Sequence, residues 1–200
     1  MSFDVAKLSK FYGRSRNPQI AGIVFSFIVD PKFTARLAGL FYVGTIVTGA
    51  YAAMSAQGRT VANLISAACY VVVTLLFYRI FKPVHRGLSL FAGIVSLIGC
   101  SLTFLGVFRL APSYPSPLAL FGIYCVLIGY LILRSTFLPH FLGVLMMLGG
   151  VGWLTFASAQ LASRLAPYNM APGVLAETAL TLWLVIFGVK AARWNEQSRQ

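Results

Sequence analysis

The sequence predicts an all-α, polytopic membrane protein with six transmembrane helices and a short amino-terminal interfacial helix. Of its 200 residues, 58% are hydrophobic and 10% are charged, with a mean hydropathy of +0.82. A soluble globular domain has about 25% charged residues. Backbone groups in lipid must be satisfied internally, and the alternating pattern of a barrel strand is absent, so helices are expected. Six apolar stretches are long enough to cross a bilayer, at 37–56, 61–81, 88–108, 117–133, 141–161 and 172–189.

Residues 1–34 are predicted to form a basic cytoplasmic segment that precedes the first span. Within it, the apolar run 20–29 (IAGIVFSFIV) is about half as long as a bilayer crossing requires. This run is expected to lie along the interface, to dip into the membrane and return, or to pack as a helix beneath the bundle. The basic residues before it favour contact with anionic lipid headgroups.

The remaining chain is predicted to form one six-helix transmembrane domain at 35–191 and a cytoplasmic tail at 192–200. The connections between spans are short, so no soluble domain is inserted between helices. Any function is therefore expected to lie between the helices or at a membrane face.

The distribution of Lys and Arg predicts the orientation of the chain. Three of these residues, Arg59, Arg109 and Arg164, fall on one predicted side. The other thirteen share the opposite side, which the positive-inside rule makes cytoplasmic: Lys7, Lys10, Arg14, Arg16, Lys32, Arg36, Arg79, Lys82, Arg86, Arg134, Lys190, Arg193 and Arg199. We therefore expect a multi-pass protein of the cytoplasmic membrane with both termini in the cytoplasm. The net charge of +12 is read as a topology signal rather than a nucleic-acid interface.

Aligning the sequence with itself at an offset of 56 residues suggests an internal repeat. The shift pairs the second and third spans with the fourth and fifth in parallel, and with the first span this gives up to three related helical hairpins. Shared requirements of turns and close helix contacts would produce the same coincidences. The superposed pairs are Cys69 with Cys125, Pro83 with Pro139, Gly87 with Gly143 and Gly93 with Gly149.

Several phrases of the chain resemble an uncharacterised bacterial integral-membrane family, domain of unknown function four-three-eight-six. They are RLAGLFYVGTIVTG, LFYRIFKPVHRGLSL, GYLILRSTFLPHFLG and LAETALTLWLVIFGVK, and the likeness runs over residues 35–190. The family's Arg-Ser-Phe-Leu-Pro-Leu-Gly pattern and its glutamate-leading last helix correspond to Arg134, Ser135, Phe137, Leu138, Pro139, Leu142, Gly143, Glu177 and Trp183. The resemblance implies a six-helix membrane protein of the bacterial inner membrane and no established activity. The outer connection at 57–60 is shorter than the family's, and His85 and His140 are not expected family residues.

The chain offers few groups for catalysis or cofactor binding. Cys69, Cys100 and Cys125 all fall inside predicted spans and are interpreted as small buried residues. Two histidines, His85 and His140, lie at span starts and are interpreted as interfacial rather than as ligands of a metal or haem. We predict no cofactor and no metal site, and no catalytic pair that would make this protein an enzyme.

Glu177 is the candidate functional residue because it lies within the last span, where an uncompensated charge is costly. It is expected about 9 Å below the outer end of that helix. One interpretation is a buried hydrogen bond or ion pair that fixes the helix, with Asn63, Gln160, Arg109 or Arg164 as partner. The other is an outward-facing polar pocket that binds a small polar or cationic ligand or accepts a proton. The predicted ligand-binding set is Glu177, Asn63, Tyr51, Tyr124, Gln160 and Arg109.

The favoured functional prediction is a compact structural or accessory membrane component, which binds lipid, another membrane protein or further copies of itself. The alternative is a small carrier or ligand-binding membrane protein built around Glu177. Compactness and the absence of catalytic motifs favour the first, and the intramembrane acid favours the second.

Overall fold

The computed structural model describes residues 30–108, 110 and 116–199; the apolar run 20–29 and Arg109 lie outside them. These residues contain six helices long and apolar enough to cross a membrane, which confirms the predicted all-α, six-span fold. The first four are α3 (Pro31–Met54), α4 (Arg59–Phe81), α5 (Arg86–Val107) and α6 (Pro117–Arg134). The fifth span, His140–Ala157, consists of α7 (His140–Leu154) and a 3₁₀ turn, and the sixth, Tyr168–Ile186, consists of a 3₁₀ turn and α9 (Ala171–Ile186).

Local capping explains where several spans begin. Asp30 caps α3 by accepting a hydrogen bond from the Lys32 backbone N–H at 2.9 Å, and Pro31 supplies the first helical residue. Helix α3 therefore begins before the predicted boundary at residue 35. His85 caps α5 through Nδ1, which accepts from Leu88 N–H at 3.0 Å. This capping bond gives His85 a structural role at the helix start.

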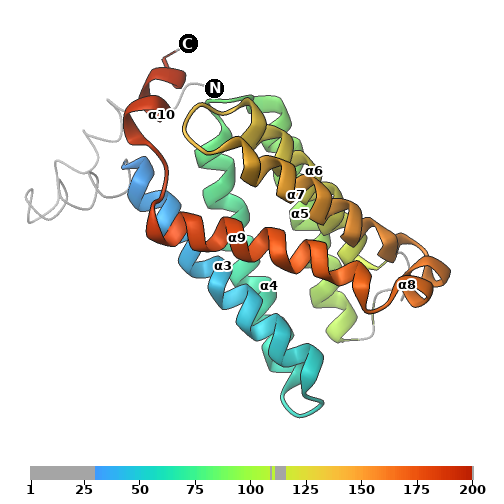
Figure 1. Ribbon diagram of the computed structural model, residues 1–200. Coiled ribbons are helices and arrows are strands. Elements are labelled where there is room, and N and C mark those ends of the chain that lie inside the picture. The colour runs from blue at the N-terminus through green and yellow to red at the C-terminus, as the bar shows by residue number, and fades with distance from the viewer. Residues whose placement is uncertain (1–29, 109, 111–115, 200) are drawn as a thin grey trace, which may run out of the picture.

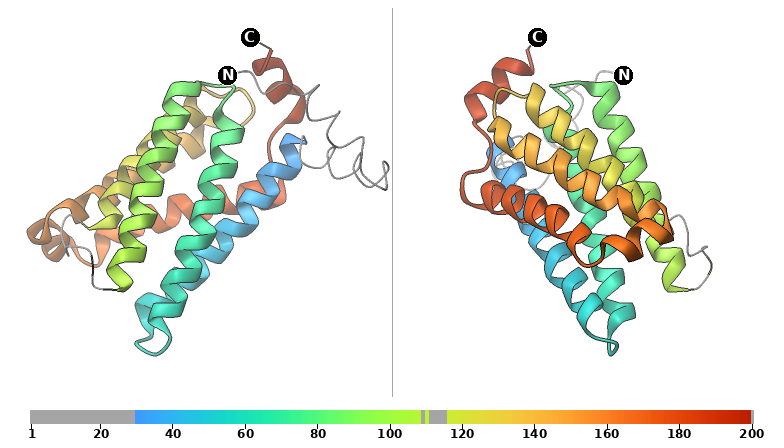
Figure 2. Two further views of the ribbon diagram at one scale, coloured as in Figure 1. Left: turned by 180° about the vertical axis from the view of Figure 1, so that it is seen from behind. Right: turned by 45° about the vertical axis from the view of Figure 1, so that its right-hand side comes forward.

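The six long helices close into a ring. Each packs against the next in chain order, and the last, α9, packs against both α7 and α3. Figure 1 and Figure 2 show α9 crossing α3 obliquely rather than running parallel to it. The ring therefore encloses a common interior to which all six helices contribute side chains.

The two described ends of the chain lie at one end of this ring. Helix α10 (Ala191–Gln197) is there, with the start of α3 and the turns at 82–85 and 135–139 (Figure 1, Figure 2). We call this the α10 end. The α3–α4 loop and the short helix α8 (Ala159–Leu165) lie at the opposite end. The two hairpins matched by the sequence offset thus turn at the same end of the bundle.

The predicted tail at 192–200 contains most of α10, which is bonded to the bundle. Trp194 Nε1 donates to the Ile80 carbonyl at 2.9 Å. Gln197 Oε1 accepts from the Thr136 backbone N–H at 3.1 Å, and its amide donates to the Arg134 carbonyl at 3.2 Å. Helix α10 therefore ties the end of α4 to the turn after α6.

Glycine allows α6 and α7 to approach each other closely. A Cβ built on Gly143 would lie 2.7 Å from the Gly129 carbonyl oxygen, and one built on Gly150 would lie 2.7 Å from the Gly122 carbonyl oxygen. Backbones can come this near only where side chains are absent. Gly143, proposed from the sequence as a packing position, is buried in this contact.

The fifth span ends earlier than predicted. Helix α7 stops at Leu154, a 3₁₀ turn continues to Ala157, and α8 then runs separately. Thr155 Oγ1 donates a hydrogen bond to the Gly152 carbonyl at 2.7 Å and accepts one from Asn169 Nδ2 at 2.9 Å. These side-chain bonds stabilise the turn, so the apolar stretch that reached residue 161 does not continue as one helix.

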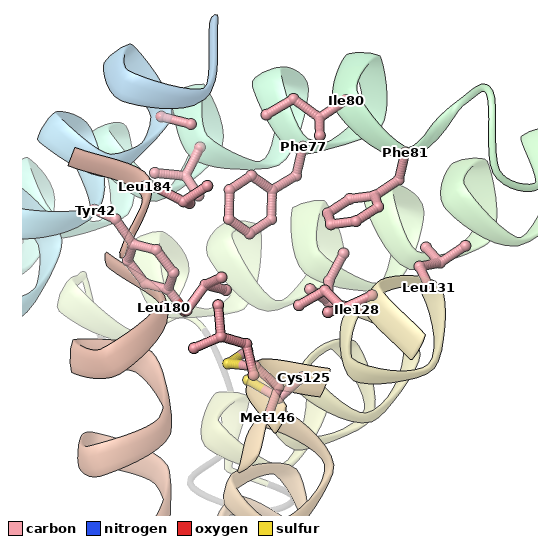
Figure 3. Close-up of a cluster of buried hydrophobic side chains, with 14 of the residues drawn as sticks. Tyr42, Phe77, Ile80, Phe81, Cys125, Ile128, Leu131, Met146, Leu180 and Leu184 are labelled. Atoms are coloured by element: carbon pink, nitrogen blue, oxygen red, sulfur yellow. The ribbon is translucent and has the colours of Figure 1, made fainter. Parts of the chain in front are cut away.

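The interior is mainly apolar and aromatic toward the α10 end. Figure 3 shows Phe77, Ile80 and Phe81 of α4 facing Ile128 and Leu131 of α6. Nearer the middle of the ring, Tyr42 of α3 points toward Leu180 of α9, and Cys125 lies close to Met146 (Figure 3). Polar groups gather at this middle level.

Candidate functional site

Glu177 reaches the interior because of the helical periodicity of α9. The buried face of this helix includes Gly173, Ala176, Leu180 and Leu184, and positions three and four residues apart share one side of a helix. Glu177 lies four residues after Gly173 and three before Leu180, on the flank of this face. Its side chain is partly buried.

Two neutral groups bind the Glu177 carboxylate. Trp153 Nε1 donates to Oε1 at 2.7 Å, and the Cys125 thiol donates to the same oxygen at 3.6 Å. The indole contributes a normal strong bond, whereas the thiol is a weak donor. Since neither partner is charged, these bonds would not compensate a negative charge on the Glu177 side chain.

Trp153 holds this position because Gly173 gives it room. The indole packs against Gly173 of α9, where even a Cβ would overlap the ring. Trp153 also contacts Phe156 at a centroid distance of 6.0 Å. The indole N–H is therefore aimed at α9 by packing on both sides.

Three buried tyrosines lie near the carboxylate. Tyr42 of α3, Tyr70 of α4 and Tyr124 of α6 are 0%, 5% and 1% exposed, and all three hydroxyls interact electrostatically with Glu177. Their rings form a chain, with centroids 5.6 Å apart for Tyr42 and Tyr70 and 5.9 Å apart for Tyr70 and Tyr124. We call these three tyrosines with Glu177, Trp153 and Cys125 the polar centre.

None of the three buried tyrosine hydroxyls makes a hydrogen bond of ordinary geometry in the described part of the chain. The Tyr42 hydroxyl lies near Tyr70 and Glu177, and the Tyr124 hydroxyl lies near Thr74, outside that geometry. The Thr181 hydroxyl, one turn after Glu177, likewise makes no hydrogen bond of ordinary geometry there. By contrast, Thr74 and Ser96 pair through their hydroxyls at 2.6 Å between α4 and α5. Buried polar side chains are usually paired, so several unpaired hydroxyls around one carboxylate are unusual.

The structure brings Tyr124 together with Glu177, but not the other predicted site residues. Tyr51 is 51% exposed, and its hydroxyl donates to the Gln57 carbonyl in the α3–α4 loop. Asn63 lies in the first turns of α4, and Gln160 is exposed on α8. No hydrogen bond joins any of these three described residues to Glu177. Arg109 lies outside the described residues.

Helix length and tilt explain these differences. Helix α3 has 24 residues and spans about 36 Å, whereas α9 has 16 and spans about 24 Å. The end of α3 therefore extends past the start of α9, which also crosses it obliquely (Figure 1). The expectation that Tyr51 and Asn63 lie beside Glu177 came from counting residues inward from the helix ends, which assumes helices of equal length. The helices differ in length, so residues at equal counts lie at different levels. The expected partner Arg164 is exposed on α8, and Trp153 and Cys125 bind Glu177 instead.

Sequence reasoning missed Tyr42, Tyr70 and Trp153, and interpreted Cys125 only as a small buried residue. A signal for the tyrosines was present. Tyrosine is enriched where membrane and water meet, yet Tyr42 and Tyr70 lie near the middle of α3 and α4. A hydroxyl at that depth needs a partner in the protein, which marks these positions as polar sites.

No metal-binding group of three or more His, Cys, Asp or Glu occurs among the described residues. His85 is occupied as a helix cap, and His140 begins α7 with an exposed side chain. The polar centre thus contains one carboxylate, one thiol, three tyrosine hydroxyls and an indole.

Six apolar helices closed into a ring around a mainly apolar interior define a polytopic α-helical membrane protein. The family model described as Domain of unknown function (DUF4386) matches residues 54–116 and 112–188. The chain belongs to this family, as its sequence resemblance indicated. No curated protein and no solved structure matches the chain.

Proposed function

We propose that this protein resides in the bacterial inner membrane with both termini in the cytoplasm. Exposed Lys and Arg side chains at the α10 end support this orientation, because basic residues concentrate on the cytoplasmic side. The opposite end carries Arg59 and Arg164. Anionic headgroups of the inner leaflet are the natural partner of the basic end. Its exposed members include Lys32, Arg36, Arg79, Lys82, Arg86, Arg134, Lys190, Arg193 and Arg199.

We infer that the protein is a small ligand-binding or carrier protein whose solute binds at the polar centre. The observation that carries this inference is the set of unpaired hydroxyls of Tyr42, Tyr70 and Tyr124 around the Glu177 carboxylate. An unsatisfied buried polar group costs about 1–3 kcal/mol. Three such groups at one place are expensive for a purely structural core, whereas a bound solute would satisfy them together.

A structural or accessory role is the second candidate. The bond from Trp153 to Glu177 favours it, because it links α7 to α9 and so helps to close the ring. In that case the ring would serve as a platform for another membrane protein or for further copies of this chain. A structural role does not account for the three buried tyrosine hydroxyls.

Solute-dependent melting in detergent separates the two candidates. Purified protein is heated with ammonium chloride, choline chloride, glycine or glycerol, and melting temperatures are compared for wild type, Glu177→Gln and Glu196→Gln. A solute that binds only the folded state raises stability by about 1.4 kcal/mol at ten times its Kd. We expect at least one probe to stabilise the wild type and Glu196→Gln but not Glu177→Gln.

Glu196 is the matched control, because it is exposed on α10 and far from the polar centre. Tyr124→Phe provides a second test of the site should Glu177→Gln fold poorly. Identical responses of wild type, Glu177→Gln and Tyr124→Phe to every probe would contradict solute binding at this site.

A further inference from the structure

We propose that the polar centre binds a small cation that carries N–H groups, either ammonium or a primary ammonium ion. Glu177 and the hydroxyl oxygens of Tyr42, Tyr70 and Tyr124 would accept its hydrogen bonds. This proposal rests on the proposed function and specifies the class of solute.

The hydrogen-bond partners of Glu177 indicate the sign of the charge that the solute carries. Trp153 and Cys125 are neutral donors, so their bonds do not cancel a negative charge held among apolar helices. A charge in that environment is costly unless an opposite charge accompanies it. An anionic solute would meet repulsion from an ionised Glu177, so a cation is favoured.

The number and type of hydrogen bonds point to N–H donors. A tyrosine oxygen that is free of other bonds accepts readily, and a carboxylate only accepts when ionised. The polar centre therefore offers acceptors from four helices: α3 through Tyr42, α4 through Tyr70, α6 through Tyr124 and α9 through Glu177. Ammonium has four N–H donors and a primary ammonium ion has three. Tetramethylammonium has none, and neither has potassium, which is close to ammonium in size.

Packing around the centre limits the size of the solute. Cys125, Met146, Ala176 and Leu180 each have no more than 1% of their surface exposed. These residues come from three different helices and belong to the same buried core as the three tyrosines. A bulky organic cation would have to displace them, whereas ammonium is close to a water molecule in size and methylammonium adds only one methyl group.

Binding of radiolabelled methylammonium to purified protein in detergent tests the proposal. We expect saturable binding that ammonium chloride competes away and that equal concentrations of potassium chloride or tetramethylammonium chloride do not. A hydrogen bond to a charged group contributes about 1.5–3 kcal/mol, so Glu177→Gln should weaken binding at least about tenfold. Tyr124→Phe keeps the ring but loses the acceptor, and it should also weaken binding.

Two matched variants control for general effects of these substitutions. Glu196→Gln removes an exposed carboxylate, and Tyr51→Phe removes the hydroxyl of an exposed tyrosine that bonds only within its own loop region. Both should bind methylammonium as the wild type does. Should Glu177→Gln fail to fold, competition between methylammonium and the other cations for binding to the wild type still tests the requirement for N–H donors. Equal competition by tetramethylammonium or potassium would overturn the requirement for N–H donors.

Failure of this proposal differs visibly from failure of the proposed function. Suppose that wild type binds no methylammonium, yet glycine, glycerol or choline stabilises it and not Glu177→Gln. The assignment of the solute as ammonium or a small primary ammonium ion would then be wrong, while a solute site at the polar centre would stand. If no probe distinguishes wild type from Glu177→Gln in either assay, both proposals fall.

Discussion

The indole nitrogen of Trp153 lies 2.7 Å from Glu177 Oε1, and this bond joins the last turn of α7 to the middle of α9. Since α9 also packs against α3, the bond helps to hold the helix that closes the ring. The same carboxylate faces three unpaired tyrosine hydroxyls. One residue therefore connects the integrity of the fold with the candidate site.

Trp153→Phe is expected to lower stability. Phenylalanine retains an aromatic ring against Gly173 but has no N–H, so Glu177 Oε1 keeps only the weak thiol bond. The expected loss is about 1–3 kcal/mol, measured by denaturation in detergent. Trp183→Phe is the control, because Trp183 makes ring contacts with Phe141 and Phe187 rather than a hydrogen bond to Glu177. A larger loss for the control would show that the indole N–H contributes little.

Glutamine and leucine at position 177 should differ in stability. Glu177→Gln keeps an oxygen that can accept from Trp153, whereas Glu177→Leu leaves the indole N–H buried without a partner. We expect the leucine variant to be less stable than the glutamine variant by about 1–3 kcal/mol. In a Trp153→Phe background this difference should shrink, because the donor is gone. An unchanged difference there would mean that the two residues are not coupled.

The helices could be predicted from the sequence because hydropathy and length are local properties. Each span in lipid must satisfy its own backbone, so an apolar run of sufficient length indicates a helix without knowledge of its neighbours. Glu177 was recognisable for the same reason, since a carboxylate in such a run is rare. The end of the fifth span could not be recognised from the sequence, because it depends on bonds among Thr155, Gly152 and Asn169.

The partners of Glu177 could not be predicted because they depend on how the helices face one another. Trp153 reaches α9 because Gly173 lets the indole approach, and the tilt of α9 sets the level that Glu177 occupies. Neither property follows from hydropathy. Counting residues from helix ends grouped Tyr51 and Gln160 with Tyr124, whereas in the structure Tyr51 and Gln160 are exposed and Tyr124 is buried in the interior.

Gly143→Ala should destabilise the bundle, while Gly106→Ala should not. A Cβ at Gly143 would lie 2.7 Å from the Gly129 carbonyl oxygen and 2.8 Å from Leu133 Cγ, so α6 and α7 would have to separate. At Gly106 a Cβ would meet nothing within 4 Å, and alanine is the better helix former. Melting temperatures of the two variants in detergent test this directly. Equal melting temperatures would remove the close α6–α7 contact as a source of stability.

Trp194→Phe should loosen α10 without unfolding the ring. The substitution removes the bond from Nε1 to the Ile80 carbonyl, which holds α10 against the end of α4. Trypsin should then cleave faster after Lys190 or Arg193, while the melting temperature of the bundle changes little. Asn195→Ala is the control, because Asn195 is exposed and its backbone carbonyl, which accepts from Ser198 Oγ, is unchanged by the substitution. Faster cleavage in both variants alike would indicate that α10 is loosely held regardless of Trp194.

Thiol labelling in intact cells should place α10 and the turn at 135–139 on the cytoplasmic side. In a background that lacks Cys69, Cys100 and Cys125, single cysteines are introduced in place of residues that are all partly or fully exposed: Gln57 in the α3–α4 loop, Ser163 on α8, Thr136 in the turn and Ser198 after α10. An impermeant maleimide added outside should label the first two positions. The other two should react only after the membrane is opened, because the exposed Lys and Arg residues concentrate at their end of the ring. Labelling of the Ser198 position in intact cells would reverse the proposed orientation, and labelling of Ser198 but not Thr136 would contradict the packing of α10 against that turn.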